Sequence, residues 1–382
     1  MARFTKNDIM SLTGETPTYD LAESVGPDLL LGDLLGDLLS GAGQNDLNDL
    51  ALGYRTAQGD PRLREALADL HGVEPDDVVI TVGGMQALFL TAFILCEKGD
   101  EAVTTSPLFP LARNALEVVG ATVRTLPLSF DQGYRLDPDA LRQQLSPRTK
   151  LVSLATPQNP SGVAIPRETL REVVALMAEV CPEAYLLVDE TYREAVYGDD
   201  AVVESAIDLG SKVLTCASLS KCHGAPGLRL GWVITRDADL REQLTIGKFS
   251  TVISCSAIDE ALALEVLRQR DRILDARRER LAGGLARTAD WMAAHDALVE
   301  WVRPDAGALC CLRLRSTAFD EMAVGRFYDA LAADGVRVAN GTWFGEEARV
   351  FRLGFGLMSM PDLEAALKGL SAAVRKTARA AA

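Results

Sequence analysis

Short apolar runs alternate with longer stretches of helical character from about residue 77 onward. The runs that predict strands are 77–81, 101–104, 122–126, 150–154, 184–188, 213–217 and 228–234. Short apolar strands that are separated by helices and buried on both faces are typical of a largely parallel sheet. The pattern therefore predicts an α/β protein whose mostly parallel, seven-stranded sheet is flanked by helices.

The pattern changes after about residue 255, where helices become longer and more charged. A long helix is predicted from Ser256 through Arg280, followed by shorter strands at 308–314 and 350–355. This change indicates a second, smaller α+β domain, which the N-terminal residues are expected to join. We expect a large domain of residues 46–274 and a small domain made of residues 1–45 and 275–382.

Composition and charge narrow the function classes. The 382 residues include 48% hydrophobic and 24% charged residues, as in an ordinary globular protein, and the net charge is −15. Such a chain repels nucleic acid and anionic membrane surfaces, so neither is expected as a partner. The start has no secretory signal, and the most apolar run, Ala87–Leu95, is too short to span a membrane.

Cysteine and histidine usage points to a cytoplasmic protein without a metal. The seven cysteines form an odd set without a Cys-x-x-Cys pair, which is typical of reduced core residues. The three histidines lack ligand-like spacing, so no metal site is expected.

Lys221 is the strongest candidate for chemistry. It lies in a polar turn after a predicted strand, with Ser218, Ser220 and Arg229 close by in the sequence. A lysine that is held out of water loses its proton more easily and can attack carbonyl groups. Serine and arginine suit an anion, so an aldehyde that carries a phosphate, pyridoxal 5′-phosphate (PLP), is the indicated partner. A solvated surface lysine is the alternative.

Two further strand ends carry residues that suit a phosphorylated aromatic ring, since ligands of α/β sheets bind beyond the carboxyl ends of strands. Gly84, Met85 and Gln86 open a predicted helix, whose free N–H groups favour a phosphate, although a simple tight turn has the same pattern. Phe109 follows the next strand and can stack on a flat heterocycle or fill the core.

Four polar residues complete the candidate site. Asn159 can donate to a phenolic oxygen or form an Asx-Pro turn, and Tyr192 is near enough to contact the same ring oxygen. Asp189 ends an apolar strand, where a carboxylate needs a partner such as a protonated pyridine nitrogen, unless it caps a helix. Arg352 lies within an apolar strand and can grip a carboxylate, unless it is a surface arginine at a sheet edge.

Taken together, these residues resemble fold type I PLP-dependent enzymes of the class I/II aminotransferase family, the group of aspartate aminotransferase. The resemblance extends from about Gly14 to Phe355. It implies that Lys221 is the Schiff-base lysine and carries a proton between the substrate α-carbon and C4′ of the cofactor. It implies that Asp189 pairs with the ring nitrogen. The other implied cofactor contacts are Asn159 and Tyr192 at the ring oxygen, Phe109 on the ring face, and Gly84, Met85, Gln86, Ser218, Ser220 and Arg229 at the phosphate.

The resemblance also implies a homodimer and a substrate pocket. Tyr54 matches the tyrosine that reaches the phosphate of the neighbouring subunit, so the active sites would be shared. Arg352 matches the clamp for the substrate α-carboxylate, and Asn159 and Gly14 match residues that line the substrate pocket. The sequence departs from the family in carrying Met85 at the phosphate turn. No second arginine is assignable to a side-chain carboxylate, which argues against an aspartate-like substrate.

The expected function is a PLP-dependent aminotransferase that moves an amino group between an amino acid and a 2-oxo acid by a ping-pong mechanism. Another PLP-dependent reaction on an amino acid, by elimination, cyclisation or oxidation in specialised biosynthesis, is the alternative, because the same residues serve it. A PLP-sensing regulator is disfavoured by the acidic charge and by a resemblance that begins near Gly14, leaving no room for a DNA-binding module.

Overall fold

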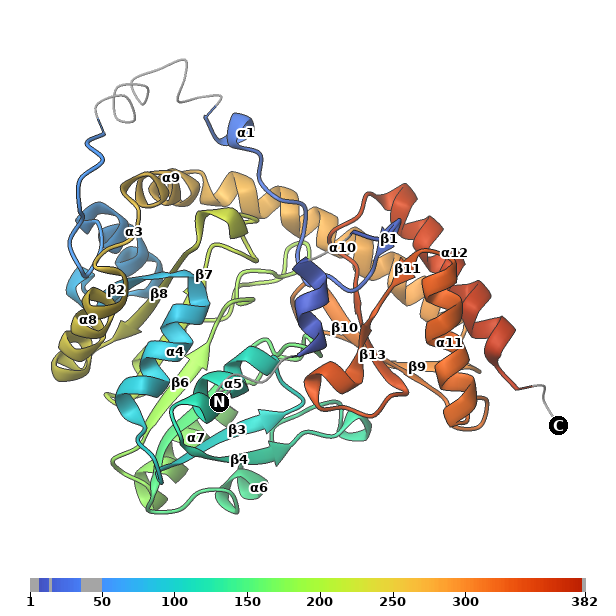
Figure 1. The fold of residues 1–382 in the computed structure, drawn as a ribbon, viewed down its shortest axis with the longest axis horizontal. Coiled ribbons are helices and arrows are strands. Elements are labelled where there is room, and N and C mark those ends of the chain that lie inside the picture. Colours follow the sequence, from blue (N-terminus) through green and yellow to red (C-terminus); the bar gives the residue numbers. More distant parts are fainter. Residues whose placement is uncertain (1–6, 14–15, 36–49, 380–382) are drawn as a thin grey trace.

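A seven-stranded sheet forms the centre of the computed structural model, which describes residues 7–13, 16–35 and 50–379 (Figure 1). Its strand order is β2-β8-β7-β6-β5-β3-β4. In chain order these strands are β2 (Val78–Val82), β3 (Glu101–Ser106), β4 (Thr122–Pro127), β5 (Thr149–Ala155), β6 (Tyr185–Asp189), β7 (Val213–Ser218) and β8 (Leu230–Thr235). Each coincides with a predicted strand to within two residues at either end.

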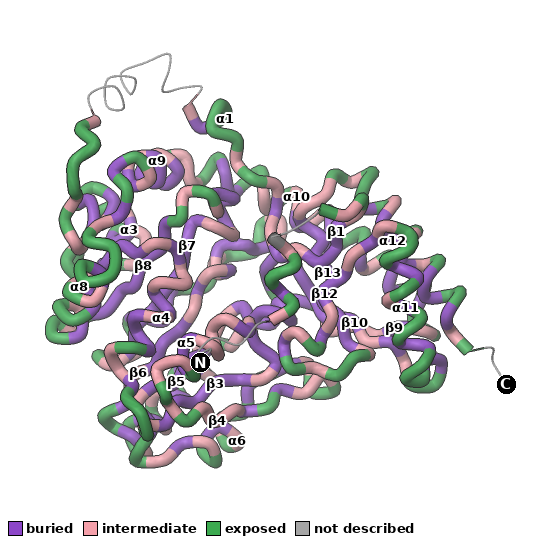
Figure 2. The backbone as a smooth tube through the Cα atoms, viewed as in Figure 1, coloured by how far each residue is buried: buried purple, intermediate pink, exposed green. Residues whose placement is uncertain are grey.

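The sheet is mostly parallel, as predicted. Only β8 runs antiparallel to its neighbours β2 and β7, while the other adjacent strands are parallel. Successive side chains of a strand point to opposite faces. In β5, Val152 and Leu154 pack into the core on one face and Leu151 packs into the core on the other. Both faces of the sheet are therefore buried, which is why its strands read as continuous apolar runs (Figure 2).

Helices cover both faces of this sheet. The α-helices of the described residues are α1 (Leu31–Leu35), α3 (Pro61–His71), α4 (Gly83–Leu95), α5 (Pro110–Val118), α6 (Pro138–Arg142), α7 (Arg167–Val180), α8 (Ala238–Val252), α9 (Ala257–Arg268), α10 (Arg270–Ala294), α11 (Glu321–Ala333) and α12 (Met360–Thr377). Apolar side chains of α4, α5 and α8 pack on one face of the sheet. Those of α6 and α7, and of α3 and α9, pack on the other.

The C-terminal part forms a second core around a four-stranded antiparallel sheet of order β12-β13-β10-β9. Its strands are β9 (Val299–Val302), β10 (Leu309–Leu314), β12 (Ala339–Asn340) and β13 (Val350–Gly354). Helices α10, α11 and α12 pack against it. The N-terminal strand β1 (Tyr19–Asp20) pairs in parallel with β11 (Val336–Arg337), so the N-terminal segment lies beside this part of the chain.

Of two predicted boundaries, that of the long helix is wrong and that between the domains stays a prediction. The predicted helix from Ser256 through Arg280 is wrong as one helix, because Gln269 leaves helical geometry, with ψ near 13°, and separates α9 from α10. The side chain of Gln269 instead donates to the Leu34 carbonyl oxygen at 3.1 Å. The domain division stays a prediction: its 45/46 boundary lies outside the described residues, and its other boundary falls within α10.

The structure also contains strands that the sequence did not indicate. These are β1, β9, β11 and β12, of which all but β9 have two residues. Within the described ranges, no helix is long and apolar enough to cross a membrane.

Candidate active site

Lys221 follows the carboxyl end of β7 and points into the centre of the candidate site. Its Nζ donates a hydrogen bond to Ser24 Oγ at 3.3 Å. Burial lowers the pKa of Lys221 to about 8, with Glu23 raising it and Arg352 and Arg229 lowering it further. A lysine with this pKa has a large neutral fraction near pH 8, and the neutral amine is the form that attacks carbonyl carbon.

Asp189 ends the neighbouring strand β6, where its backbone pairs with Cys216 of β7 and Ala155 of β5. Its carboxylate accepts a hydrogen bond from the backbone N–H of Thr191 at 3.0 Å. Burial raises the pKa of Asp189, and the positive charge of Lys221 only partly opposes this. Asp189 nevertheless keeps some accessible surface in this deep position. A buried acid that is still reachable and lacks a hydrogen-bonded cation fits a protonated ring nitrogen.

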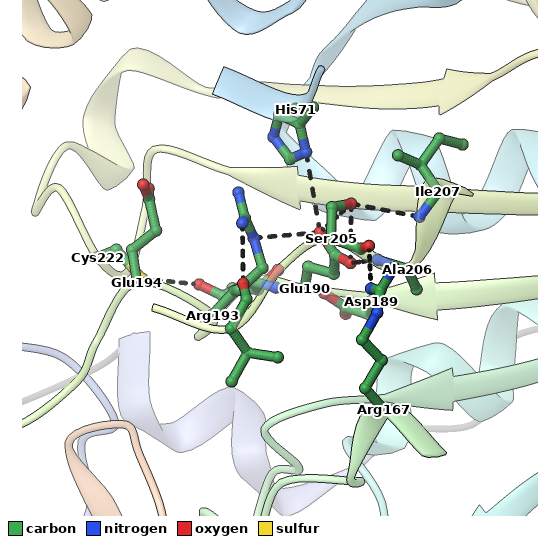
Figure 3. Close-up of polar contacts among 12 residues, drawn as sticks. His71, Arg167, Asp189, Glu190, Arg193, Glu194, Ser205, Ala206, Ile207 and Cys222 are labelled. Carbon is green, nitrogen blue, oxygen red and sulfur yellow. Dashed lines mark hydrogen bonds and ion pairs between the residues drawn. The ribbon is translucent and has the colours of Figure 1, made fainter. Parts of the chain in front are cut away.

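A polar network behind Asp189 holds this end of the sheet in place (Figure 3). The carboxylate of Glu190 accepts from Ser205 Oγ at 2.9 Å, from the Ala206 N–H at 2.7 Å, and from Arg193 at 3.2 Å. His71 lies 3.9 Å away, but burial lowers its pKa to about 3, so it is neutral there. These bonds fix the loop that follows Asp189.

Tyr192 lies in that loop, and its side chain and that of Lys221 both bond to Ser24. Its hydroxyl donates to Ser24 Oγ at 3.0 Å, and it is buried. Burial raises the pKa of Tyr192 to about 12, against the effect of Arg352. The phenol therefore stays protonated and able to donate to an oxygen of a ligand.

Arg352 lies in the middle of a sheet rather than at its edge, because β13 is flanked by β12 and β10. It is 1% exposed. Its Nη1 donates to Asn159 Oδ1 at 2.8 Å, its Nη2 donates to the Ala22 carbonyl oxygen, and its guanidinium lies 4.8 Å from the centre of the Phe344 ring. Its Nε is buried without a hydrogen-bond partner. The alternative of a surface arginine is therefore excluded, and the unpaired cation suits a carboxylate ligand.

The start of α4 converges with Ser218 and Arg229. Gly83 has a φ of +68°, which disfavours any other residue, and a Cβ built on it would lie 2.3 Å from Arg229 Nη2 and so displace that guanidinium. A Cβ on Gly84 would lie 3.8 Å from Ser218 Oγ. The first N–H groups of a helix lack partners within the helix, and together with an arginine and a serine they fit a phosphate.

Side chains of the other predicted phosphate residues point elsewhere. Met85 packs against the core that α4, α5 and α8 form on one face of the sheet. The Gln86 side chain accepts from the Val82 N–H at 2.7 Å and donates to Thr251 at 3.3 Å. Only the backbones of Met85 and Gln86 are thus left for a phosphate.

Of the remaining predicted residues, Phe109 and Ser220 lie beside parts of this centre and Tyr54 lies at the surface. Phe109 precedes α5 and packs beside Ala22 and Phe344, close to Arg352. Tyr54 is 83% exposed. Ser220 contributes its backbone N–H to Ser218 Oγ at 3.4 Å. Gly14 lies outside the described residues.

Sequence reasoning missed Ala22 and Ser24, and it looked for the N-terminal contact at Gly14. Ser24 is buried and contacts both Lys221 and Tyr192, while the carbonyl of Ala22 contacts Arg352. The available signal was an acid and a serine directly after an apolar pair, Leu21 and Ala22.

A pocket of about 400 Å³, including its open mouth, borders this centre on one side. Lys221, Tyr192 and Ser24 belong to its lining, together with Glu194, Cys222 and residues of α10 such as Arg277. Asp189, Asn159 and Arg352 do not line it. Across the described residues, no group of His, Cys, Asp and Glu side chains could hold a metal ion.

The donor set fits PLP in three separate respects. An amine of lowered pKa suits its aldehyde, a buried acid suits its ring nitrogen, and a helix start with an arginine suits its phosphate. No single one of these features would specify the cofactor, but all three follow the carboxyl ends of β2, β6 and β7, which lie at the same edge of the sheet.

Comparisons with known proteins agree with this fit. A family model described as aminotransferase class I and II matches residues 38–370. Capreomycidine synthase from Streptomyces vinaceus is 30% identical over 367 residues, which are 96% of this chain and 89% of that protein. An arginine–pyruvate transaminase from Pseudomonas aeruginosa is 28% identical over 332 residues, covering 82% of this chain and 80% of that protein. The solved structure of a PLP-dependent cyclase has a TM-score of 0.83 and 28% identity, covering 95% of this chain and 94% of that one.

The family model thus matches most of the chain, including the whole seven-stranded sheet. The chain belongs to the class I/II aminotransferases, fold type I enzymes whose cofactor is PLP.

Proposed function

We propose that this chain is an aminotransferase that moves an amino group from an amino acid to a 2-oxo acid by a ping-pong mechanism. The observation that supports it most is the position of Arg352. A buried guanidinium without a carboxylate partner lies beside Asn159, while Ser24 and Ala22 connect it to the amine of Lys221. An amine and a carboxylate clamp at one centre suit an α-amino acid.

In this proposal Lys221 is the covalent anchor of PLP and the other residues orient the cofactor. When bound, PLP withdraws electrons from the α-carbon of the amino acid joined to it. Asp189 would hold the proton on the ring nitrogen, and Asn159 and Tyr192 would donate to the ring oxygen. Phe109 would cover the ring face. The phosphate would be held by the backbone N–H groups of Gly84, Met85 and Gln86 and by the side chains of Ser218 and Arg229. Ser220 would orient the Ser218 hydroxyl through its backbone N–H.

Lys221 also has the properties of a proton carrier. Its pKa of about 8 is near physiological pH, so the amine can take a proton from the substrate α-carbon and return it at C4′ of the cofactor. Arg352 would keep the substrate carboxylate fixed while the proton moves.

We also propose a homodimer with shared active sites. Tyr54 and Leu52 are strongly exposed, and α8 exposes Ile246, Phe249 and Val252. The Arg55 N–H donates to Ser254 Oγ at 3.3 Å, which joins the Tyr54 segment to the loop after α8. Exposed apolar side chains of this number favour a covering partner, and a second copy would bring Tyr54 to the phosphate of its neighbour. The cytoplasm is the proposed location, since all seven cysteines are buried and unpaired.

A second candidate function is cyclisation or another PLP-dependent reaction in biosynthesis. It is favoured by the similarity to capreomycidine synthase and to a PLP-dependent cyclase. The residues around Lys221 activate the α-carbon in either case, so they do not distinguish the two functions. Arginine is a suitable first amino donor to test, given the similarity to an arginine–pyruvate transaminase.

Product stoichiometry separates the two functions. The PLP-loaded protein is incubated with amino acids labelled with ¹⁵N at the α-nitrogen, first alone and then with a 2-oxo acid. Transamination gives one equivalent of the 2-oxo acid product per site alone, and continuous transfer of the label to a new amino acid after the second addition. Release of ammonia, uptake of oxygen or a cyclic product without label transfer would contradict transamination and support the second candidate.

A further inference from the structure

Residues 21–29, here called the connecting segment, join the two chemical ends of the candidate site. The first end is β13, which carries Arg352. The Gly354 N–H of this strand donates to the Leu21 carbonyl oxygen at 2.6 Å, and Arg352 itself donates to the Ala22 carbonyl oxygen. The beginning of the connecting segment is therefore bound to the strand of the proposed carboxylate clamp.

The second end is the turn that carries Lys221. Ser24 Oγ accepts from Lys221 Nζ at 3.3 Å, and the Leu29 N–H donates to the Gly224 carbonyl oxygen at 2.7 Å. The connecting segment thus contacts the lysine side chain and the backbone of its turn. Its course sets the position of Lys221 relative to β13.

Arg277 of α10 is inserted where the connecting segment meets this turn. Its Nη2 donates to the Pro27 carbonyl oxygen. A Cβ built on Gly224 would overlap the same nitrogen, and a Cβ on Gly26 would lie 2.7 Å from Nη1. The guanidinium is therefore packed between a glycine of the connecting segment and a glycine of the Lys221 turn. It also lines the same pocket as Lys221 and Ser24.

The other two arginines of this pocket have different contacts. Arg278 forms an ion pair within its own helix, with Asp275 at 3.5 Å. Arg280 donates to the carbonyl oxygens of Gly356 and Leu357 at 3.0 Å each, which joins α10 to the chain after β13. In Figure 1, α10 runs from α9 beside the large sheet to the second core. One rigid helix thus holds both the end of β13 and the connecting segment.

No carboxylate among the described residues forms an ion pair with Arg277, which is half-buried. Its charge is directed at a backbone carbonyl oxygen instead, and hydrogen bonds from charged donors are stronger than neutral ones. We propose that Arg277 is a positioning residue, which holds the connecting segment against the Lys221 turn and so keeps the amine oriented for PLP. The inference rests on the proposed role of Lys221 as the anchor of PLP.

The rate of PLP capture by Lys221 tests this role, measured by trapping with borohydride and quantifying the modified peptide. Arg277→Met keeps most of the side-chain volume and removes the donor to Pro27. Its capture rate should fall at least about 5-fold, because both Ser24 and the turn lose their support. Arg278→Met is the matched control, since it removes an arginine of the same helix turn and the same pocket. It should capture PLP at the wild-type rate.

Non-additivity distinguishes positioning from a general loss of stability. Ser24→Ala should slow capture about 5-fold when Arg277 is present. Once Arg277→Met has released the connecting segment, Ser24 no longer orients the amine, so adding Ser24→Ala should slow capture by less than about 2-fold. A further 5-fold loss in the double variant would overturn the proposal, because Arg277 would then act independently of Ser24.

Gly26→Ala tests the same contact without removing the arginine, and it decides the matter if Arg277→Met does not fold. The added methyl group would meet Arg277 Nη1, the end of a flexible side chain, so the guanidinium can move aside while the backbone keeps its course. Capture should slow in this variant too. A wild-type rate in Gly26→Ala, or in folded Arg277→Met, would overturn the proposal.

The failure of this inference is distinguishable from the failure of the proposed function, since no amino acid or 2-oxo acid is used. If Lys221→Ala captures as much PLP as the wild type, the proposed anchor is wrong. If Lys221→Ala loses capture and Arg277→Met keeps it, the anchor stands and the role of Arg277 is wrong.

Discussion

Lys221 Nζ donates a hydrogen bond to Ser24 Oγ at 3.3 Å, across 197 residues of sequence. This contact joins the turn after β7 to the N-terminal segment, and Tyr192 adds a second bond to the same hydroxyl. The serine therefore orients two side chains that are proposed to act on the cofactor.

Replacing Ser24 with alanine should loosen both contacts without unfolding the protein. Loss of one neutral hydrogen bond costs about 1 kcal/mol, so we expect the rate of PLP capture by Lys221 to fall about 5-fold. The rate is measured by stopping the reaction with borohydride and quantifying the modified Lys221 peptide. Ser11→Ala, at an exposed serine of the same N-terminal region, is the control. An unchanged rate in Ser24→Ala would show that the serine does not position the amine.

The pH dependence of PLP capture follows from the lowered pKa of Lys221. The neutral amine reacts, and burial brings its pKa from 10.5 to about 8. The rate should therefore rise with pH through about 8 and level off above 9. An ordinary lysine is only about 0.3% neutral at pH 8. Reaction of PLP with N-acetyl-lysine corrects for titration of PLP itself, and a rate that still climbs to pH 10.5 would contradict the assignment.

Asp189 should lower the stability of the protein without PLP and raise its affinity for PLP. Burial raises the pKa of this acid, so its ionised form is unfavourable until a cation binds. Without PLP, the Asp189→Asn variant should melt at the same or a higher temperature than the wild type. With PLP, its gain in melting temperature should be smaller. A larger gain in the variant would mean that Asp189 does not pair with the cofactor.

Arg352 should likewise be important for activity without stabilising the fold. It is buried without a carboxylate partner, and replacing a buried charge by an apolar residue of similar size is often neutral or stabilising. We expect Arg352→Met to keep its free energy of unfolding within about 1 kcal/mol of the wild type or to increase it. Its kcat/KM should fall at least about 100-fold, because a bidentate carboxylate contact is lost. A loss of more than about 3 kcal/mol in stability would assign Arg352 a structural role.

Mixing two inactive variants tests the shared sites of the proposed homodimer. Tyr54→Ala and Lys221→Ala would each damage every site of their own dimers. A mixed dimer, in contrast, has one site with both changes and one with neither. Unfolding and refolding the mixture should therefore restore activity, measured as label transfer. If the refolded mixture stays inactive although sedimentation shows that dimers have formed, Tyr54 does not act in the neighbouring site.

The sequence predicted the sheet well because its strands are buried on both faces. Runs such as 184–188 are apolar at every position, and no periodicity needs to be resolved. The short strands β1, β11 and β12 were missed because two residues carry no pattern. The break at Gln269 was missed because it depends on a hydrogen bond to Leu34, far away in the sequence.

The candidate site was predictable where residues follow strands of the sheet. Asp189 ends β6 and Lys221 follows the neighbouring strand β7, and the order of the sheet brings them together. Ala22 and Ser24 reach the site from an irregular segment that follows β1, which pairs with β11. No local pattern encodes that pairing, so the N-terminal contact was sought at Gly14 instead.

The most direct test of the central assignment is the location of bound PLP on the chain. The PLP-loaded protein is reduced with borohydride, digested, and its peptides are identified by mass spectrometry. The account predicts that the mass of the reduced cofactor is found on Lys221, in a yield of about one per chain, and that Lys221→Ala loses it. Label on another lysine, or an undiminished yield in Lys221→Ala, would contradict the account.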